Sequence, residues 1–350
     1  MKRCSFSVSA VMSYGIVENV FSKIDSLHGK KLIFYSSSLK YLLQDIAGKN
    51  IDAYSLADGE GLKSFNHVIS IVKIMMENNL SRNDYVIAIG GGTLTDATGF
   101  AASIFKRGVR LINVPTTLLG MIDAAIGGKT AINFLGTKNI VGSFYFPDSV
   151  WVNLRFLDSL RQDKYKDGIA EMLKYGFIMD PNLLKLMLER RNDLLDRKKM
   201  TLRHSILSCI GDKVRIVGMD SLESSNIRII LNYGHTIGHA IEAASHFKVS
   251  HGEAISVGML LEAAFSEQIL ELPVNLSVSI KEALESFSLP VSVDDLKTNM
   301  DIDLLRKALY QDKKAEDDCI FIPILQQIGK ATVRKISMKT LEDFLVSSIE

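Results

Sequence analysis

The sequence predicts an α/β protein in which a parallel-sheet domain is followed by a mainly α-helical domain. Short apolar runs alternate with helical patterns through the first half of the chain, and one run leads through a glycine-rich turn into a helix. Beyond about residue 158, apolar residues recur three and four positions apart. Strands that alternate with helices pair in parallel, and the longer period belongs to amphipathic helices. We therefore expect two domains, residues 1–157 and 158–350.

Composition narrows the classes of partner. Among 350 residues, 41 Lys and Arg nearly balance 40 Asp and Glu, so the chain lacks the charge excess that attracts nucleic acid or an anionic membrane. Its apolar stretches are shorter than the roughly 18 residues that span a bilayer. Its three cysteines are far apart, which fits a reducing compartment. We expect a cytoplasmic protein with a small-molecule partner, and neither nucleic acid nor a membrane as partner.

The first domain should contain strands at residues 31–35, 84–89 and 109–114, with a helix at residues 37–46. A glycine cluster, residues 90–99, follows the second of these strands and opens a helix that ends near residue 105. Backbone N–H groups at such a helix N-terminus bind phosphate. The spacing differs from GxGxxG, so a plain tight turn is an equal alternative to a dinucleotide site.

Three further segments flank these strands. In residues 58–63, an acidic side chain would accept from ribose hydroxyls and Lys63 would meet a phosphate, with a solvated loop as the alternative. Thr116 and Thr117 follow the strand at residues 109–114, at the sheet edge where open α/β folds bind ligands. Residues 121–142 should form a long irregular loop of functional character. Its polar residues are Asp123, Lys129, Asn133, Lys138 and Asn139.

The second domain should be helical through residues 170–177, 183–195, 241–270 and 280–289, with a strand at residues 319–325. Glu171 and Lys174 lie three residues apart on one helical face. Such a pair is often a surface salt bridge. Here the surrounding segment is apolar, and a carboxylate in it needs a partner such as a metal.

Three of the seven histidines, His235, His239 and His251, lie within seventeen residues. In a helix, His235 and His239 share one face. Neutral imidazole together with carboxylate is a zinc-binding combination. A metal site is the first hypothesis, and ordinary polar helix residues are the alternative, since the glutamate of HExxH is missing.

Motifs from about residue 58 to residue 329 form an ordered set. They are Gly90-Gly-Gly with Asp96, Arg107-Gly-Val, Val114-Pro-Thr-Thr-Leu-Leu, Asp123 with Gly-Gly-Lys129-Thr, Lys138-Asn139, Ala170-Glu171 with Lys174-Tyr-Gly, Asn232-x-Gly-His235 with Gly-His239, His251-Gly-Glu and Asp312-Lys-Lys. Taken together, this set resembles the 3-dehydroquinate synthase family. Many motifs in register are far more specific than any one of them.

The resemblance implies an NAD-binding α/β domain, a helical metal-binding domain and a homodimer. The expected metal is a divalent ion, Zn²⁺ or possibly Co²⁺, with Glu171, His235 and His251 as its ligands. Residues that match the family's substrate-binding and catalytic set are Asp123, Lys129, Asn139, Lys174, Lys213, Arg228, Asn232, His239 and Lys313 or Lys314. Arg107 resembles a residue that reaches the neighbouring subunit's site. The expected nucleotide contacts are Asp58, Glu60, Lys63, Gly91, Gly92, Thr93, Asp96, Thr116, Thr117 and Lys138.

This chain departs from the family pattern at two places. Thr95 stands where the family generally has glycine, so this side chain either crowds a bound pyrophosphate or points away. The link between Glu223 and Arg228 is one residue longer than usual, so Lys213 and Glu223 match only if an insertion is allowed.

The implied reaction converts a phosphorylated sugar acid, 3-deoxy-arabino-heptulosonate 7-phosphate, into 3-dehydroquinate and phosphate with NAD recycled, and His239 shuttles a proton. Two alternatives remain open. One is another sugar-phosphate cyclase, of the deoxy-inosose or valiolone synthase type, and the other is a metal-dependent polyol or glycerol-phosphate dehydrogenase. Arg228 and Asn232 favour the first reading, because a substrate carboxylate needs a cationic fork.

Overall fold

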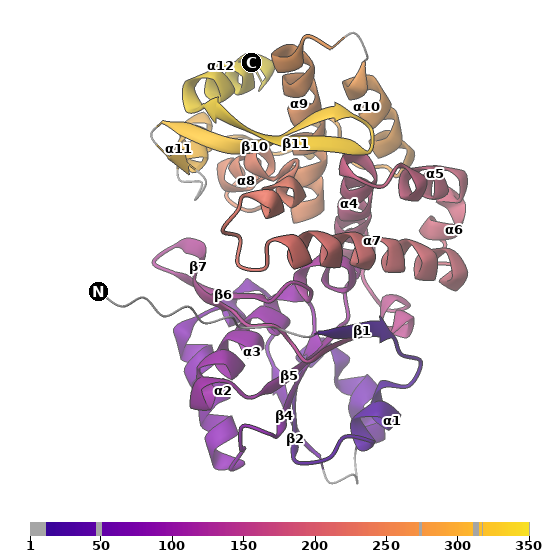
Figure 1. Cartoon of the computed structure of the whole chain (residues 1–350), viewed down its shortest axis with the longest axis vertical. Helices are drawn as coiled ribbons and strands as arrows, with labels where there is room; N and C mark the ends of the chain where they lie inside the picture. Colours follow the sequence, from indigo (N-terminus) through magenta and orange to yellow (C-terminus); the bar gives the residue numbers. More distant parts are fainter. Residues whose placement is uncertain (1–11, 47–50, 273–274, 311–314, 317, 350) are drawn as a thin grey trace, which may run out of the picture. The chain divides into compact units, whose positions relative to one another are not determined.

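The structure is a computed structural model that describes residues 12–46, 51–272, 275–310, 315–316 and 318–349. The chain divides into two units, Met1–Phe156 and Leu157–Glu350. The first unit contains a parallel sheet and the second is mostly helical (Figure 1). The fold class expected from the sequence is therefore confirmed.

In the described part of the first unit, six strands form a parallel sheet in the order β1-β8-β5-β4-β2-β3. Three of them agree with the expected strands: β2 (Lys31–Ser36), β4 (Tyr85–Gly90) and β5 (Arg110–Pro115). The others are β1 (Ser13–Ile16), β3 (Asp52–Leu56) and β8 (Ser149–Val152). Every residue of β4 is buried, which explains why its sequence is a continuous apolar run rather than an alternating one.

Helices α2 (Phe65–Glu77) and α3 (Gly92–Ile104) pack on one face of this sheet, where Ile71 and Ala97 share a core with Phe34. Figure 1 places α1 (Val20–Asp25) on the other side of the strands. The expected helix at residues 37–46 has the 3₁₀ form. This segment is η1 (Ser37–Ile46). The other short helical segments of this unit are η2 (Glu60–Leu62), η3 (Phe105–Arg107) and the π-helix η4 (Gly120–Ala124).

The segment at residues 121–142 was expected to be irregular, and this was wrong. After η4, the chain forms an antiparallel hairpin of β6 (Lys129–Phe134) and β7 (Thr137–Phe144). In β6, Thr130 and Ile132 are buried, while β7 has no fully buried position among its described residues. Two alternating buried positions are too few to give a clear period-two signal.

Helices dominate the second unit, with two breaks that the sequence pattern did not indicate. The expected helix at residues 183–195 is divided in two, and the pattern at residues 241–270 is interrupted between residues 244 and 251. The helical segments are η5 (Leu154–Leu157) at the unit boundary, α4 (Gln162–Ile178), α5 (Pro181–Glu189), α6 (Arg191–Leu195), α7 (Lys199–Met219), η6 (Ile227–Asn232), α8 (His235–Ala244), α9 (His251–Leu270), α10 (Leu276–Ser286), η7 (Asp294–Leu296), α11 (Ile302–Tyr310) and α12 (Met338–Ile349).

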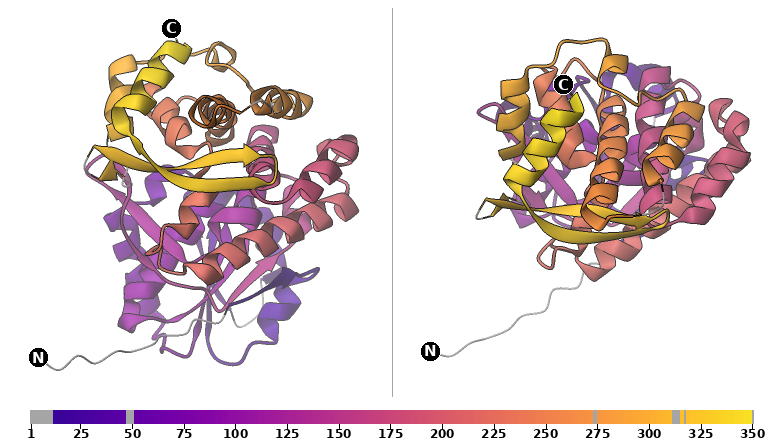
Figure 2. Two further views of the ribbon diagram at one scale, coloured as in Figure 1. Left: turned by 45° about the horizontal axis from the view of Figure 1, so that its top comes forward. Right: turned by 90° about the horizontal axis from the view of Figure 1, so that it is seen from above.

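The expected strand at residues 319–325 is confirmed as β10 (Cys319–Gln327), which pairs antiparallel with β11 (Lys330–Ser337) and the short β9 (Ala315–Glu316). Figure 2 shows the β10–β11 hairpin beside α9 and α12. Ile322 of β10 and Leu341 of α12 belong to one apolar core with residues of α8 and α9. This core holds the two helices that carry the histidines.

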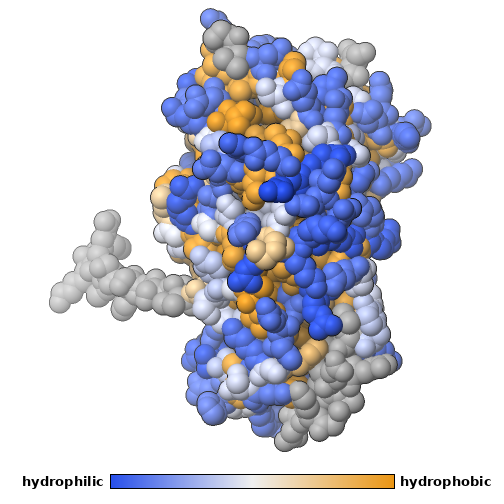
Figure 3. Space-filling model, turned by 90° about the vertical axis from the view of Figure 1, so that its right-hand side faces the viewer, coloured by the Kyte–Doolittle hydropathy of each residue, from blue (hydrophilic) through white to orange (hydrophobic). Residues whose placement is uncertain are grey.

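None of the helices in the described ranges is long and apolar enough to cross a membrane. Figure 3 shows hydrophilic side chains over most of the face it presents, with apolar side chains in smaller groups between them. Scattered apolar groups of this kind are ordinary on a protein surface.

Candidate functional site

Helix α4 carries a fully buried carboxylate. Glu171 is 0% exposed, a position that requires charged or hydrogen-bonding partners. Its Oε1 lies 3.2 Å from His235 Nε2 and 3.1 Å from His251 Nε2, and its Oε2 lies 2.5 Å from Lys174 Nζ. The structure thus brings the three expected metal ligands together with one of the expected substrate-binding lysines.

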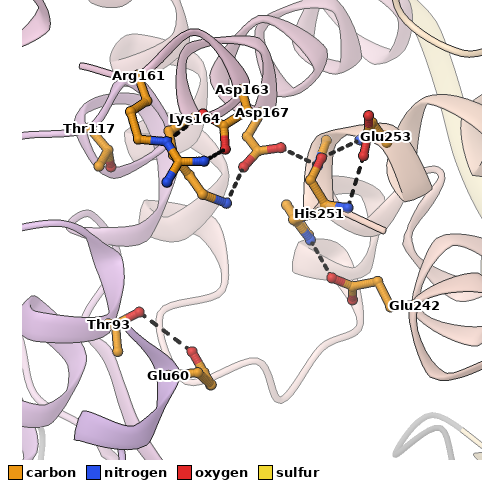
Figure 4. A network of polar contacts seen from close by, with 12 residues as sticks. Glu60, Thr93, Thr117, Arg161, Asp163, Lys164, Asp167, Glu242, His251 and Glu253 are labelled. Atoms are coloured by element: carbon orange, nitrogen blue, oxygen red, sulfur yellow. Dashed lines mark hydrogen bonds and ion pairs between the residues drawn. The ribbon is translucent and has the colours of Figure 1, made fainter. Parts of the chain in front are cut away.

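The two imidazoles that face Glu171 are oriented through their other nitrogen. His235 Nδ1 lies 3.1 Å from the carbonyl oxygen of Tyr233. His251 Nδ1 lies 3.5 Å from Glu242 Oε1, and Figure 4 shows this side chain directed at Glu242. An imidazole that donates from Nδ1 keeps the lone pair of Nε2 for a metal ion. Both Nε2 atoms therefore converge on the carboxylate of Glu171.

Two overlapping groups of donor atoms lie within 4.8 Å of one another: Glu171, His235 and His251, and His239, Glu242 and His251. The second group would use His251 Nδ1, which faces Glu242. The first group uses Nε2 of His235 and Nε2 of His251, which both face Glu171. The orientation of the rings favours the first group. Two imidazole nitrogens and one carboxylate oxygen form a donor set of catalytic zinc sites, so these residues fit the expected divalent metal.

The electrostatics of this group are coupled. Burial by itself raises the pKa of Glu171, but Lys174 and His235 outweigh it and hold that pKa well below its ordinary value. Burial lowers the pKa of His235, and the attraction of Glu171 does not fully offset it. Burial would also lower the pKa of His251, yet its contacts with Glu171 and Glu242 raise it to about 10. The group is therefore a carboxylate with one neutral and one protonated imidazole near neutral pH, and a metal bound there would replace the proton of His251.

The N-terminus of α9 is tied to α4. Ser250 accepts from the Glu253 N–H and Glu253 accepts from the Ser250 N–H, which forms a capping box. Asp167 of α4 accepts from the Gly252 N–H at 2.9 Å and from Lys164 Nζ at 3.0 Å (Figure 4). Because His251 is the first residue of α9, these contacts set its distance from Glu171, one turn further along α4.

The N-terminus of α8 is held by a carboxylate from α9. Gly234 precedes the helix in the left-handed region, with φ of 78°, and has no side chain with which to cap it. Glu262, which is fully buried, accepts from the Gly234 N–H at 2.8 Å and from the Ile237 N–H at 3.4 Å. A carboxylate at this end of a helix satisfies unpaired N–H groups and complements the helix dipole. Glu262 thereby fixes the helix that carries His235.

The other expected residues of this unit occupy different settings. Lys213 and Arg228 are buried, Asn232 is the last residue of η6 next to the start of α8, and His239 is exposed. The ring centroids of His235 and His239 are 5.3 Å apart, so His239 lies beside the metal-ligand candidates, and it belongs to the second donor group with Glu242 and His251. Lys313 and Lys314 lie outside the described residues.

Three carboxylates of this region were missed in the sequence analysis: Glu242, Glu262 and Asp220. Asp220 accepts from the backbone N–H groups of Ser224, Ser225 and Arg228 and so organises the loop with the additional residue. The sequence does contain a signal for such residues, namely an acidic residue on the apolar face of a helix, as for Glu262 in α9. A carboxylate that is buried there requires a partner.

In the first unit, the glycine-rich turn leads from β4 into α3 and lies beside the carboxyl end of the neighbouring strand β5. Gly90 of β4 pairs with Pro115 of β5, and the Thr116 N–H donates to the Gly90 carbonyl at 3.0 Å. A Cβ atom at Gly91 would lie 3.2 Å from Thr117 Cγ2. The expected nucleotide contacts Gly91, Gly92, Thr116 and Thr117 are therefore neighbours, at the N-terminus of α3 where backbone N–H groups can meet an anion.

Most of the remaining expected nucleotide contacts form hydrogen bonds or ion pairs with other polar residues of this unit. Asp58 accepts from Ser36 Oγ, from Ser37 Oγ at 3.0 Å and from the Ser38 N–H at 3.0 Å. Burial by itself raises the pKa of Asp58, but these hydrogen bonds outweigh it and lower that pKa. Separately, Lys63 forms an ion pair of 2.6 Å with Asp96, and Thr93 donates a 3.4 Å hydrogen bond to Glu60 (Figure 4).

The structure places Thr95 away from the open side of the turn. Its side chain is 2% exposed, and Oγ1 donates to the Gly92 carbonyl at 3.0 Å. The structure therefore favours the expectation that Thr95 points away over the expectation that it crowds a bound pyrophosphate.

Other expected residues of the first unit lie on the segment after β5 and at the far end of α3. Asp123 is in η4, Lys129 begins β6, and Lys138 and Asn139 lie on β7. Arg107 is exposed, with φ of 61°. It follows the end of α3, about 20 Å from the glycine turn at 1.5 Å per residue, so the structure does not bring it together with that turn.

Comparison with known families identifies both halves of the chain. Residues 53–167 match the family model of the 3-dehydroquinate synthase N-terminal domain, and residues 168–315 match that of its C-terminal domain. The 3-dehydroquinate synthase of Sulfurisphaera tokodaii is 39% identical over 342 residues, which cover 97% of this chain and 96% of that protein.

Solved structures support the same fold. A 2-epi-5-epi-valiolone synthase from Streptomyces hygroscopicus, with NAD⁺ and Zn²⁺ bound, superposes with a TM-score of 0.87 at 24% identity over 99% of this chain and 98% of that one. A 2-deoxy-scyllo-inosose synthase, in complex with carbaglucose-6-phosphate, NAD⁺ and Co²⁺, has a TM-score of 0.80 at 24% identity over 96% of each chain.

Proposed function

The chain belongs to the 3-dehydroquinate synthase family, and on this premise we propose that it converts 3-deoxy-arabino-heptulosonate 7-phosphate into 3-dehydroquinate and phosphate. The observation that carries the proposal is the match of both family models in sequence, together with 39% identity over nearly the whole chain. The product belongs to the shikimate pathway of aromatic amino-acid biosynthesis. The enzyme is an NAD- and metal-dependent lyase that eliminates phosphate.

Glu171, His235 and His251 would hold the divalent metal. When bound, the metal supplies charge that acidifies a coordinated alcohol, and NAD supplies reversible uptake of a hydride. The buried Lys174 lies 2.5 Å from Glu171 Oε2, so its ammonium group keeps this carboxylate ionised. Zn²⁺ and Co²⁺ both suit the donor set, as the ions in the two cyclase structures indicate.

The chain's own residues divide the remaining tasks. Arg228, Asn232 and Lys213 would bind the anionic groups of the substrate, because a carboxylate and a phosphate need cationic and amide donors. His239 is exposed and lies beside His235, and we assign the proton shuttle to its imidazole.

The alternatives considered from the sequence are not favoured. The 3-dehydroquinate synthase of Sulfurisphaera tokodaii is 39% identical to this chain, whereas the valiolone and inosose synthases are each 24% identical to it. A butanol dehydrogenase of Thermotoga maritima shares the fold at 13% identity and a TM-score of 0.67.

We further propose that the protein is a cytoplasmic homodimer. The exposed Arg107 lies at the end of α3 remote from the glycine turn of its own chain, which suits a residue that reaches a partner's site. Sedimentation of the purified protein would test the dimer.

One incubation series tests the proposed reaction. The protein with NAD and Zn²⁺ is given either 3-deoxy-arabino-heptulosonate 7-phosphate or glucose 6-phosphate, and free phosphate and NADH absorbance are followed. We expect phosphate release from the first substrate, a need for NAD, and no net NADH. Phosphate release from the hexose phosphate alone would indicate a different cyclase, and steady accumulation of NADH would indicate a dehydrogenase.

A further inference from the structure

The β6–β7 hairpin has an irregular register at Asn133. Ile132 pairs with Val141 and Phe134 pairs with Thr137. Asn133 thus separates two paired residues of β6, while Lys138, Asn139 and Ile140 separate their partners on β7. An excess of residues on one strand forms a bulge, and bulges redirect side chains next to functional sites. Here the bulge contains Lys138 and Asn139, which match the family's nucleotide-binding and substrate-binding residues.

One hydrogen bond to the Asn133 side chain ties this bulge to β6. Asn133 Oδ1 accepts from the backbone N–H of Asn139 at 2.9 Å, so a side chain supplies the acceptor that the displaced strand no longer offers. Asn139 has a φ of 53°, a left-handed conformation that asparagine adopts more readily than most residues. The contact from Asn133 therefore stabilises an uncommon backbone conformation at a predicted substrate-binding residue.

Asn133 also connects the hairpin to the loop that contains Glu60 and Lys63. Its Nδ2 donates to Glu60 Oε1 at 2.8 Å, and its backbone N–H donates to the Lys63 carbonyl at 2.9 Å. Glu60 Oε2 accepts from Thr93 at the glycine turn (Figure 4). Lys63 Nζ donates both to Asp96 and to Asn139 Oδ1. The loop, the glycine turn and the bulge are thus joined within one unit.

We propose that Asn133 is a positioning residue that fixes the Lys138–Asn139 bulge to the nucleotide-binding loop and so couples nucleotide binding to substrate binding. This inference rests on the proposed function, in which Lys138 and Asn139 keep the roles of the family residues that they match, and it adds Asn133, whose hydrogen bonds go to Glu60, Lys63 and Asn139. The side chain must accept from Asn139 and donate to Glu60 at once, which an amide can do. Aspartate has the same shape but would place a second carboxylate against Glu60.

The tests are the variants Asn133→Ala and Asn133→Asp, with Asn66→Ala as control because Asn66 is an exposed residue of α2 outside this network. We expect Asn133→Ala to raise KM for the sugar phosphate and Kd for NAD about 10-fold each, with kcat lowered less, since misplaced binding groups weaken ligand binding. Asn133→Asp should weaken NAD binding at least as much. Asn66→Ala should match the parent protein.

A double-mutant cycle separates positioning from general damage. If Asn133 acts through Asn139, the double variant Asn133→Ala/Asn139→Ala should have the KM of Asn139→Ala alone, whereas independent effects would multiply. The proposal would be overturned if the two substitutions multiplied their effects on KM, or if Asn133→Ala changed both KM and Kd less than twofold.

Hydrogen exchange provides a readout that does not depend on turnover. Amides of residues 137–141 should exchange at least 10-fold faster in Asn133→Ala than in the parent, while peptides of α9 stay unchanged. Unchanged protection of the bulge would contradict the proposal. If the parent protein releases no phosphate from the substrate, the proposed function fails, yet the NAD affinity and the exchange of the bulge still decide the role of Asn133.

Discussion

At the scale of single residues, the candidate metal site depends on carboxylates that bind imidazoles from two sides. Glu171 faces the Nε2 atoms of His235 and His251, while Glu242 faces Nδ1 of His251. A carboxylate behind a ligating histidine fixes its ring and raises its basicity. Glu242 thus has a structural role that differs from that of Glu171, although both lie near the same imidazole.

The variant Glu242→Gln should bind Zn²⁺ about 10- to 100-fold more weakly, the usual effect of removing a partner that orients a metal ligand. The affinity would be measured by competition with a chelator. Glu282→Gln is the matched control, since Glu282 is exposed on α10, and it should leave the affinity unchanged. Equal affinities in both variants would show that Glu242 does not orient His251.

At the scale of elements, the site depends on the close crossing of α8 and α9. A Cβ atom at Gly258 of α9 would collide with the Gly234 carbonyl, and one at Gly238 of α8 would lie 2.6 Å from an atom of Ile255. The absence of side chains at these positions lets the two helices approach closely enough for Glu262 to reach the N-terminus of α8. Packing and capping therefore act together on the helix that carries His235.

The variant Gly258→Ala should lower the free energy of unfolding by about 1–3 kcal/mol, because an additional methyl group in a packed core forces the backbone to shift. Gly218→Ala in α7 is the control, since nothing lies within 4 Å of a Cβ built there, and it should be neutral or stabilising by roughly 0.5–1 kcal/mol. Thermal unfolding of both variants is the measurement. A Gly258→Ala protein as stable as Gly218→Ala would contradict the close crossing.

A second element-scale effect concerns pH and lies on α7. Burial and the neighbouring carboxylate of Asp180 raise the pKa of Asp212 from 3.8 to about 6. A raised folded-state pKa means that the native protein binds the proton more tightly than the unfolded chain does. Ionised Asp212 therefore destabilises the fold above about pH 6, and this penalty disappears as the pH falls towards 4.

The variant Asp212→Asn should consequently have a higher Tm than the parent at pH 8 and nearly the same Tm at pH 4. A difference of about 2–4 °C at pH 8 is expected for ~1 kcal/mol in a domain of this size. The ion pair of Asp212 with Arg215 is lost too, but the Arg215 side chain is exposed to solvent, and a solvent-screened ion pair contributes little. Equal stability of the two proteins at both pH values would mean that the pKa of Asp212 is not raised.

At the scale of the whole molecule, the two ligands have donors in different units. The candidate metal ligands all lie in Leu157–Glu350, and the expected nucleotide contacts all lie in Met1–Phe156. A substitution in one unit should therefore affect one ligand directly and leave the stoichiometry of the other intact.

The variant Asp96→Ala should weaken NAD binding by 10-fold or more while the protein still purifies with one equivalent of metal. Loss of the Asp96 carboxylate removes the 2.6 Å ion pair with the buried Lys63 and so disturbs the polar contacts around the glycine turn. Calorimetry and metal analysis are the measurements, with Asp52→Ala on the exposed side of β3 as control. Unchanged NAD affinity would remove this turn from the cofactor site.

Much of the fold was predictable because its signals are local. The buried parallel strands appear as continuous apolar runs, and β2, β4, β5 and β10 were found within a few residues of their ends. The β6–β7 hairpin was not found, since its alternation covers two buried positions. The breaks at residues 190 and 245–250 were missed because apolar spacing continues across them.

The sequence by itself determined the fold class, the family and the residue types of the site, because strand and helix periods and ordered motifs are properties of neighbouring residues. The tertiary structure decided which groups meet. Glu171 contacts His251 across 80 positions of the chain, Glu262 caps a helix that begins 27 positions earlier, and Asn133 supplies an acceptor to a bulge on the next strand. Such contacts depend on how helices and strands pack, and packing is set by distant residues that no local pattern reports.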